Sequence, residues 1–244
     1  MRLFGLIGYP LAQSFSKKYF TEKFEKEGIP HCRYELFQIG SVDELPALLH
    51  AHPELQGLNV TIPYKQLVLQ YLHTTHHLPE GLRACNCIKI ENGILSGYNT
   101  DVPGFEKSFT PLLKDHHTKA LVLGNGGATA AVTFVLQKLG IRYSIVSRKM
   151  HAGSSLTYQD LGEKQMSDHP VIINTTPLGS FPAVDNCPDI PYQFLTDKHY
   201  LFDVVYNPAR SLFLQKGEER GAAVKNGYDW LVIQAEESWK IWNE

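Results

Sequence analysis

The chain has 244 residues, of which 43% are hydrophobic and 20% are charged. It can therefore bury a substantial core as one large domain or two smaller ones, and a disordered or fibrous protein is excluded. Its 23 Lys and Arg residues nearly balance 25 Asp and Glu residues, for a formal net charge of -2, so we expect a small-molecule partner and no binding to nucleic acid or membranes.

Membrane and metal-binding classes are disfavoured as well. No apolar run approaches the roughly 18 residues that span a bilayer, and the apolar stretch at the N-terminus is too short for a signal peptide, so we expect a cytoplasmic protein. The four cysteines include no CxxC pair and have no zinc-ligand spacing. We therefore expect reduced structural thiols and no metal site.

Short apolar runs alternate with helical patterns from the first residues onward, which predicts βαβ units and a mostly parallel sheet in an α/β protein. A tight turn at Asn92-Gly93, where both residues tolerate positive φ angles, predicts one β-hairpin. In this first half we predict strands at Leu3–Ile7, Arg33–Gln38, Leu58–Ile62, Cys87–Ile90 and Ile94–Tyr98, and helices at Ser16–Glu27, Val42–Leu49 and Lys65–Leu72.

A polar turn with Pro and Gly, Asn99–Gly104, separates a second series of elements and leads into a helix near Phe105. We place the joint between two domains at this turn. Beyond it we predict strands at Ala120–Leu123, Tyr143–Val146, Val171–Asn174 and Tyr200–Val205, and helices at Ala128–Leu139 and Tyr228–Trp242.

The second series opens with a strand, a glycine-rich turn and a helix of small residues. The turn reads Gly124-Asn125-Gly126-Gly127-Ala128. Glycines let the backbone approach a pyrophosphate, and the helix that follows offers it unpaired N–H groups and a positive dipole end. The pattern predicts a dinucleotide-binding turn, although taken alone it also fits an ordinary tight turn between a strand and a helix.

The turn after the next strand indicates which dinucleotide binds. About 20 residues after the first glycine, NAD-binding folds carry an acidic residue for the adenosine ribose, whereas a 2′-phosphate needs cationic donors. Here the chain reads Ser147-Arg148-Lys149, without a carboxylate. We therefore predict NADP, with Arg148 offering planar donors to the phosphate. The alternative is that Arg148 and Lys149 are ordinary exposed basic residues of a turn, without a role in binding.

Polar side chains follow several predicted strands of the first half. The segment Asn59–Lys65 ends a strand in polar residues and places Lys65 near the start of a helix. A single Lys is usually a solvated surface residue, but open α/β sheets bind ligands where their strands end. The other candidates in such places suit a small, hydroxyl-rich substrate: Ser14, Ser16, Thr61, Asn86 and Asp101.

A series of motifs stands in fixed order along the chain: Gly8–Ser16, Asn59–Lys65, Asn86, Gly97–Asp101, Gly124–Ala128, Asn174–Gly179, Asp203–Pro208, Gly227, Leu231 and Gln234-Ala235. Over nearly the whole chain, this series resembles the shikimate dehydrogenase family. The resemblance implies an N-terminal α/β substrate-binding domain, residues 1–101 plus 228–244, and a Rossmann-type NADP-binding domain with a parallel sheet, residues 102–227. It also implies reversible, NADPH-dependent reduction of 3-dehydroshikimate to shikimate, on the route to chorismate and the aromatic amino acids.

The resemblance also implies roles for individual residues. Lys65 and Asp101 look like the catalytic pair, which suits the chemistry, because hydride delivery to a ketone creates an alkoxide that a Lys held by an Asp can protonate. The implied substrate ligands are Ser14, Ser16, Thr61, Asn86, Tyr206 and Gln234. The implied cofactor ligands are Gly124, Asn125, Gly126, Gly127, Ala128, Ser147, Arg148, Lys149, Thr175, Thr176, Pro177, Val205 and Gly227.

The chain departs from the family pattern at several positions. Gln13 replaces the usual His, Cys85 and Cys87 flank Asn86 where Val and Thr are typical, and Ser147–Lys149 replaces an Asn-Arg-Thr turn. The chain also looks shorter than most relatives in the segment after this turn.

Three functions stay open at this point. They are a biosynthetic shikimate dehydrogenase, a relative that accepts quinate or uses NAD, and a nucleotide-binding regulator without catalysis. The retained Lys65 and Asp101 argue against the regulator, because a binding protein needs neither. A folate-type dehydrogenase with a similar two-domain plan would be expected to carry other motifs around its lysine. We expect a monomer or a homodimer.

Overall fold

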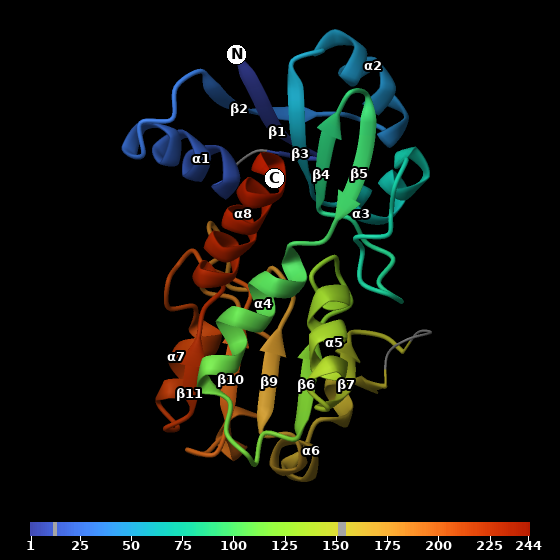
Figure 1. Ribbon diagram of the computed structural model, residues 1–244. Helices are drawn as coiled ribbons and strands as arrows, with labels where there is room; N and C mark the ends of the chain where they lie inside the picture. The colour runs from blue at the N-terminus through green and yellow to red at the C-terminus, as the bar shows by residue number, and fades with distance from the viewer. Residues whose placement is uncertain (12–13, 151–154) are drawn as a thin grey trace. The chain divides into compact units, whose positions relative to one another are not determined.

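A computed structural model describes residues 1–11, 14–150 and 155–244. The chain divides into two compact units, which are shown in Figure 1. The first unit contains Met1–Pro103 and Leu231–Glu244, and the second contains Gly104–Trp230. These boundaries lie a few residues beyond the joints expected at 101 and 228. Each unit has its own sheet and is described separately below.

The first unit is built on a mixed sheet in the order β2-β1-β3-β4-β5. Strand β1 is parallel to both β2 and β3, whereas β4 is antiparallel to β3 and to β5. The antiparallel part is the predicted hairpin, whose turn has positive φ angles at Asn92 and Gly93. The strands are β1 Arg2–Gly8, β2 Cys32–Gln38, β3 Leu55–Val60, β4 Cys87–Glu91 and β5 Ile94–Tyr98.

Two of the helices predicted in the first unit are shorter than expected. The segment expected as one helix from Val42 is a 3-10 turn, Val42–Glu44, followed by α2. Pro46 stands in the first turn of α2, where a proline ring is incompatible with a continuous helix through the preceding turn. The helices are α1 Phe15–Lys26, α2 Leu45–Ala51, α3 Tyr64–Leu67 with a 3-10 extension Val68–Tyr71, and α8 Tyr228–Asn243, which belongs to this unit from Leu231 onward.

An aromatic cluster packs α1 and the C-terminal part of α8 against the sheet of the first unit. The rings of Phe4 and Trp242 stack with centroids 4.9 Å apart, and Phe20 stacks on Tyr34 at 4.7 Å. The Trp242 indole N–H donates to the Ile88 carbonyl at 3.0 Å. Buried aromatic side chains of this size dominate core energetics, so the two ends of the chain are held in one domain by this cluster.

The second unit contains a parallel sheet in the order β11-β10-β9-β6-β7-β8. From β6 the chain runs outward through β7 and β8, and then returns to the other side of β6 for β9, β10 and β11. Figure 1 labels β11, β10, β9, β6 and β7 of this sheet. This is the Rossmann strand order, with its switch point between β6 and β9. The strands are β6 Lys119–Leu123, β7 Arg142–Ser147, β8 Leu156–Thr157, β9 Val171–Asn174, β10 Tyr200–Asp203 and β11 Ala223–Lys225.

The helix that joins the two units begins earlier than expected. Helix α4 starts at Asp101, not near Phe105. Pro103 is compatible with this start because the first N–H groups of a helix have no partner within the helix. The remaining helices of the second unit are α5 Thr129–Lys138, α6 Glu163–Asp168 and α7 Leu212–Glu218, with short 3-10 turns at Thr110–Leu112, Tyr158–Asp160 and Tyr192–Phe194.

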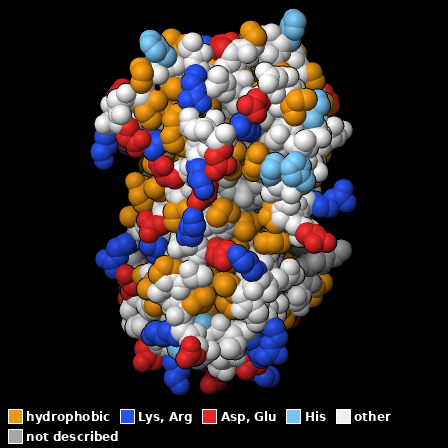
Figure 2. All heavy atoms as spheres, in the orientation of Figure 1, with side chains coloured by type: hydrophobic (Ala, Val, Ile, Leu, Met, Phe, Trp, Pro, Cys, Tyr) orange, Lys and Arg blue, Asp and Glu red, His pale blue; other side chains and the backbone are white. Residues whose placement is uncertain are grey.

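The surface carries charges of both signs. On the face shown in Figure 2, Lys and Arg side chains are interspersed with Asp and Glu side chains. Across residues 1–11, 14–150 and 155–244, no helix combines the length and the apolar character needed to cross a bilayer.

The four cysteines, Cys32, Cys85, Cys87 and Cys187, are all free thiols.

A close contact at Gly57 generates a stability prediction. A Cβ at this position would overlap the indole ring of Trp242. We expect Gly57→Ala to lower the free energy of unfolding by about 1–3 kcal/mol, as overpacked cores do, when measured by urea denaturation. Gly40→Ala is the matched control, because its Cβ would meet only the flexible end of Glu44 at 3.3 Å. Equal losses in both variants would contradict this account.

A buried histidine before β6 generates a pH prediction. His117 Nδ1 accepts the Lys114 N–H at 3.0 Å, so Nε2 carries the proton and donates to the Lys198 carbonyl at 3.2 Å. Burial lowers the pKa of His117 below 6.5. Its contribution to stability is therefore complete above about pH 6.5 and is lost as the pH falls toward the folded-state pKa.

His117→Asn tests this prediction, because the amide oxygen can accept the same N–H and does not titrate. We expect wild-type protein to lose more free energy of unfolding than the variant between pH 7.5 and pH 5.5. An identical loss in both proteins would show that another group controls this range.

Candidate functional site

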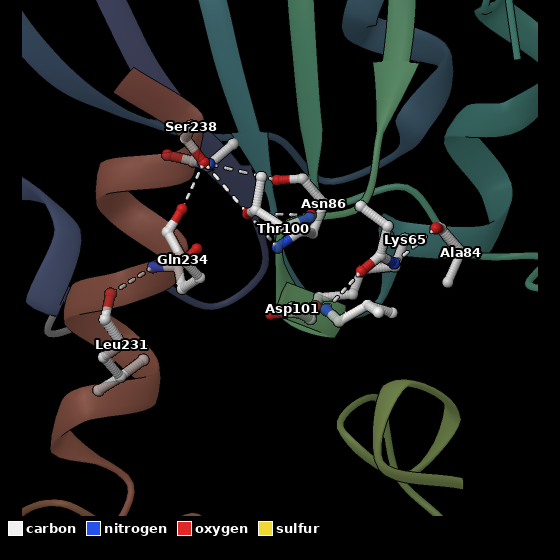
Figure 3. Close-up of polar contacts among 11 residues, drawn as sticks. Lys65, Ala84, Asn86, Thr100, Asp101, Leu231, Gln234 and Ser238 are labelled. Carbon is white, nitrogen blue, oxygen red and sulfur yellow. Dashed lines mark hydrogen bonds and ion pairs between the residues drawn. The ribbon is translucent and has the colours of Figure 1, made fainter. Parts of the chain in front are cut away.

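Lys65 and Asp101 form an ion pair in the first unit (Figure 3). Lys65 lies in the short helix α3, and Asp101 is the first residue of α4. Lys65 Nζ lies 2.7 Å from Asp101 Oδ2, and the two side chains are only 17% and 12% exposed. A carboxylate in the first helical turn also interacts favourably with the helix dipole. The pair is shielded from bulk water but still accessible to a small molecule.

Asn86 and Asn99 set the position of Asp101. Asn86 Oδ1 accepts the Thr100 N–H at 2.6 Å, and its Nδ2 donates to the Thr100 hydroxyl at 3.0 Å. Asn99 Oδ1 accepts the Val102 N–H at 3.2 Å, so both amides hold the beginning of α4. The Cys85 N–H donates to the Lys65 carbonyl at 2.8 Å. The segment around Asn86 therefore contacts Lys65 directly and holds Thr100, the residue before Asp101.

A chain of buried hydrogen bonds continues from Thr100 into α8 and the sheet. The Thr100 and Ser238 hydroxyl oxygens are 3.2 Å apart, and Ser238 donates to the Gln234 carbonyl at 2.8 Å (Figure 3). Asn59 Nδ2 donates to Ser238 at 2.9 Å, and Asn59 Oδ1 accepts from the Tyr34 hydroxyl at 2.9 Å. Buried polar networks that are fully paired rigidify a site. This network fixes the side chain of Ser238 relative to Thr100, the residue before α4.

Four members of this network were not predicted as site residues from the sequence, namely Tyr34, Asn59, Thr100 and Ser238. One signal was present, because Gln234 and Ser238 are four residues apart and share a face of α8. Tyr34 and Thr100 carried no such signal, since their partners come from distant parts of the sequence.

The predicted substrate ligands of the first unit do not all belong to this network. Asn86 does, Gln234 joins through its backbone carbonyl, and Ser16 hydrogen-bonds Tyr34, whose pKa is raised by burial. Ser14 is the N-cap of α1 and accepts the Lys17 N–H at 3.4 Å. Thr61 follows β3, and its N–H donates to the Ile7 carbonyl at 3.0 Å.

Two further positions named in the sequence analysis are described separately. Tyr206 belongs to the second unit, where burial raises its pKa. Gln13, which departs from the family pattern, lies outside the described residues.

The second unit contains a pocket of about 820 Å³ at the switch point of its sheet, within the size range of ligand sites. Gly124 follows β6 with a φ of +107°, and a Cβ there would lie 2.8 Å from Thr176 Cγ2. Only glycine suits both this backbone conformation and this contact. The pocket is lined by Gly124, Asn125, Gly126, Val146, Ser147, Arg148, Lys149, Tyr158, Thr175, Thr176, Pro177 and Leu178.

Most predicted cofactor ligands line this pocket, but four do not. Ala128 is the N-cap of α5, and Gly127 precedes it. Val205 is buried, and its carbonyl accepts the Gly227 N–H at 3.2 Å. Gly127 and Ala128 end the glycine turn, Val205 follows β10 and Gly227 follows β11. None of the four is among the lining residues.

Tyr158 is a lining residue that sequence reasoning missed. It lies in a 3-10 turn after β8, in a segment for which the sequence predicted no strand or helix. Burial raises the pKa of Tyr158, and the positive charge of Arg148 acts in the opposite direction. Arg148 and Lys149 are exposed at this part of the pocket. The combination of a tyrosine and two cations suits an aromatic base with a phosphate.

Strand ends β9 and β10 meet at a buried carboxylate beside the pocket loop. Asp203 Oδ1 accepts from Asn174 Nδ2 at 2.9 Å and from the Val205 N–H at 3.0 Å, and Oδ2 accepts from the Ser211 hydroxyl. Burial raises the pKa of Asp203 to about 6, although these hydrogen bonds act to lower it. In the part of the chain that the structure describes, no group of three His, Cys, Asp or Glu residues could hold a metal ion.

Comparisons with known proteins identify the family of this chain. Residues 6–88 match the family described as shikimate dehydrogenase substrate binding domain. The Clostridium beijerinckii protein named shikimate dehydrogenase (NADP(+)) is 35% identical over 261 residues, which cover 100% of this chain and 93% of that protein. The corresponding protein of Caldanaerobacter subterraneus subsp. tengcongensis is 32% identical and covers 99% of this chain and 91% of its own length.

One solved structure extends the comparison to bound ligands. Shikimate 5-dehydrogenase from Thermus thermophilus, solved in complex with NADP(H) and shikimate, gives a TM-score of 0.84 at 26% identity and covers 99% of this chain and 93% of that chain. Sequence and structure thus align along nearly the whole length. The chain belongs to the shikimate dehydrogenase family.

Proposed function

We propose that this protein is an NADP-dependent shikimate dehydrogenase, which reversibly reduces 3-dehydroshikimate to shikimate. The observation that carries the proposal is the shielded Lys65–Asp101 ion pair, with Nζ and Oδ2 only 2.7 Å apart. It lies in a unit that largely coincides with the matched substrate-binding family. The names of the relatives with 32% and 35% identity support the same activity.

Lys65 is proposed to move the proton of the reaction. Bound NADPH would supply the hydride that adds to the substrate carbonyl carbon, and negative charge would then develop on the carbonyl oxygen. The Lys65 ammonium group donates a proton to that oxygen, and Asp101 orients the ammonium group and balances its charge. In the oxidation of shikimate, neutral Lys65 accepts the hydroxyl proton.

The polar side chains of the first unit are proposed to bind the substrate ring. Ser14 and Ser16, at the start of α1, are suited to the ring carboxylate. Thr61, Asp101 and Gln234 are proposed to bind ring hydroxyl groups, and Tyr206 to contact the substrate or the nicotinamide. Asn86 is proposed to donate its second Nδ2 hydrogen to the substrate. Its first Nδ2 hydrogen bonds the Thr100 hydroxyl, and its side-chain oxygen Oδ1 already accepts the Thr100 N–H.

The pocket of the second unit fits a dinucleotide. The glycine turn after β6 leaves room for a pyrophosphate to approach the backbone, since a Cβ at Gly126 would meet nothing closer than 3.9 Å. Arg148 and Lys149 are proposed to bind the 2′-phosphate, and Ser147 holds their turn through a 2.6 Å hydrogen bond to the Lys149 carbonyl. The cytoplasmic location and the monomeric or homodimeric state stay predictions.

Quinate oxidation is the second candidate function. The quinate dehydrogenase of Corynebacterium glutamicum, solved in complex with NAD, gives a TM-score of 0.85 at 25% identity and covers 99% of this chain and 92% of that chain. Quinate carries one ring hydroxyl more than shikimate, so pocket shape decides between the two substrates. Spectrophotometric assays with shikimate and quinate, each with NADP+ and NAD+, separate the candidates; we expect shikimate with NADP+ to be the best pair.

The role of Lys65 generates a prediction about turnover. We expect Lys65→Met to lower kcat by at least ~100-fold, a typical effect of losing a general acid, because methionine keeps the packing of the side chain but carries no proton. The affinity for NADP+, measured by calorimetry, should change little.

Lys18→Ala is the matched control, because Lys18 is an exposed lysine with a long 3.8 Å pair to Glu22. Its turnover should equal that of the wild type. Normal turnover in Lys65→Met, with circular dichroism confirming a folded protein, would refute the assignment.

The basic turn generates a prediction about cofactor choice. We expect Arg148→Ala to weaken NADP+ binding by about tenfold, the loss expected for one charge-assisted hydrogen bond, and to leave NAD+ binding almost unchanged. Lys138→Ala is a suitable control, because Lys138 pairs with Glu106 at 2.7 Å and does not line the pocket. Equal losses for both cofactors in Arg148→Ala would rule out a role in 2′-phosphate recognition.

A further inference from the structure

The carboxylate of Asp203 plays no part in the chemistry proposed above, although it is fully buried. It ends strand β10, next to the end of β9, with which β10 pairs in parallel. Its Oδ1 atom has two donors, Asn174 Nδ2 at 2.9 Å and the Val205 N–H at 3.0 Å. Its Oδ2 atom accepts from the hydroxyl of Ser211, the N-cap of α7.

Asn174 links this carboxylate to the loop that lines the nucleotide pocket. Besides donating to Asp203, its Nδ2 donates to the Leu178 carbonyl at 3.4 Å. Its Oδ1 accepts the Thr176 N–H at 3.0 Å and the Thr176 hydroxyl at 2.6 Å. An amide has donors at one end and an acceptor at the other, so the carboxylate determines which end of Asn174 faces Thr176.

Thr176 in turn lies directly against the glycine turn. Its Cγ2 lies 2.8 Å from the place that a Cβ of Gly124 would occupy. The preceding residue, Thr175, is anchored separately, by bonds of 2.8 Å to the Leu123 carbonyl and 2.9 Å to the Thr129 hydroxyl. The orientation of Thr176 and of the residues up to Leu178 therefore depends on Asn174.

We propose that Asp203 is a positioning residue for NADP binding, which acts through Asn174 to hold Thr176 and Leu178 in place along the nucleotide pocket. The proposal rests on the proposed function only in that NADP is taken as the occupant of this pocket. Asp203 does not line the pocket itself. Its influence on the cofactor is therefore indirect and requires the hydrogen bond to Asn174.

The two oxygens of the carboxylate provide a matched pair of variants. Asp203→Ala removes the acceptor for Asn174, whereas Ser211→Ala removes only the partner of the other oxygen. Asp203→Asn should restore function, because its amide oxygen can accept from Asn174 and Val205 while its amide nitrogen donates to the Ser211 hydroxyl oxygen. A purely structural role of the carboxylate would affect Asp203→Ala and Ser211→Ala alike.

Calorimetric titration of each variant with NADP+ tests the proposal without relying on turnover. We expect Asp203→Ala to weaken NADP+ binding by about tenfold, the effect of one hydrogen bond to a charged group. Asp203→Asn and Ser211→Ala should stay within about twofold of the wild type, even where Ser211→Ala lowers the melting temperature. In steady-state assays with shikimate, the KM for NADP+ should rise in Asp203→Ala while the KM for shikimate stays constant.

A double-mutant cycle separates the path through Asn174 from the path through Val205. We expect Asn174→Ala to weaken NADP+ binding, and Asp203→Ala to add no further loss in that background. Additive losses would overturn the path through Asn174. If Asp203→Ala does not fold, Asn174→Ala interrupts the same connection and is titrated in its place.

Unchanged NADP+ affinity in Asp203→Ala, or losses in Asp203→Ala and Ser211→Ala that follow their losses of stability, would refute the positioning role. Failure of the proposed function has a different signature. In that case the wild-type protein does not oxidise shikimate with NADP+, whatever the variants do.

Discussion

The 2.6 Å hydrogen bond from the Thr100 N–H to Asn86 Oδ1 is the constraint on which the polar side chains of the first unit depend. It fixes where α4 begins, and the first residue of that helix is Asp101. Asp101 then meets Lys65, whose carbonyl is held by the residue before Asn86. Displacement of Asn86 would therefore disturb the entry to the helix, the ion pair and the link through Thr100 to Ser238 together.

Ion pairs removed from water contribute little net stability, because desolvation offsets much of their attraction. The side chains of Lys65 and Asp101 are nevertheless only 17% and 12% exposed. An apolar pair of similar volume at these two positions would stabilise the fold equally well. Asp203 is a comparable case in the second unit, since burial raises its pKa to about 6. Both units thus retain a carboxylate where a structural role alone does not require one. Proteins commonly have lower stability at functional sites for the sake of activity.

The elements predicted from sequence were those with strong local patterns. Strand β9, Val171–Asn174, and the hairpin at Asn92-Gly93 follow from apolar runs and from turn residues that tolerate positive φ. Helices α6 and α7 and strands β8 and β11 were not predicted. These elements are too short to show a periodic pattern of apolar residues. In addition, β8 and β11 lie at the two edges of the sheet, where a strand has a neighbour on one side only and its sequence is less apolar.

The sequence by itself indicated the order of the main elements, the glycine turn and the basic turn at Arg148, because each depends on residue types at short spacing. The pair of Lys65 and Asp101, which are 36 residues apart, followed from the resemblance to the family. The tertiary structure decided which polar groups meet. Asn59 and Ser238 are 179 residues apart in sequence yet share a 2.9 Å hydrogen bond, and Tyr158 enters the pocket from a segment for which the sequence predicted no strand or helix. Such contacts arise from the packing of distant segments, and no local pattern encodes them.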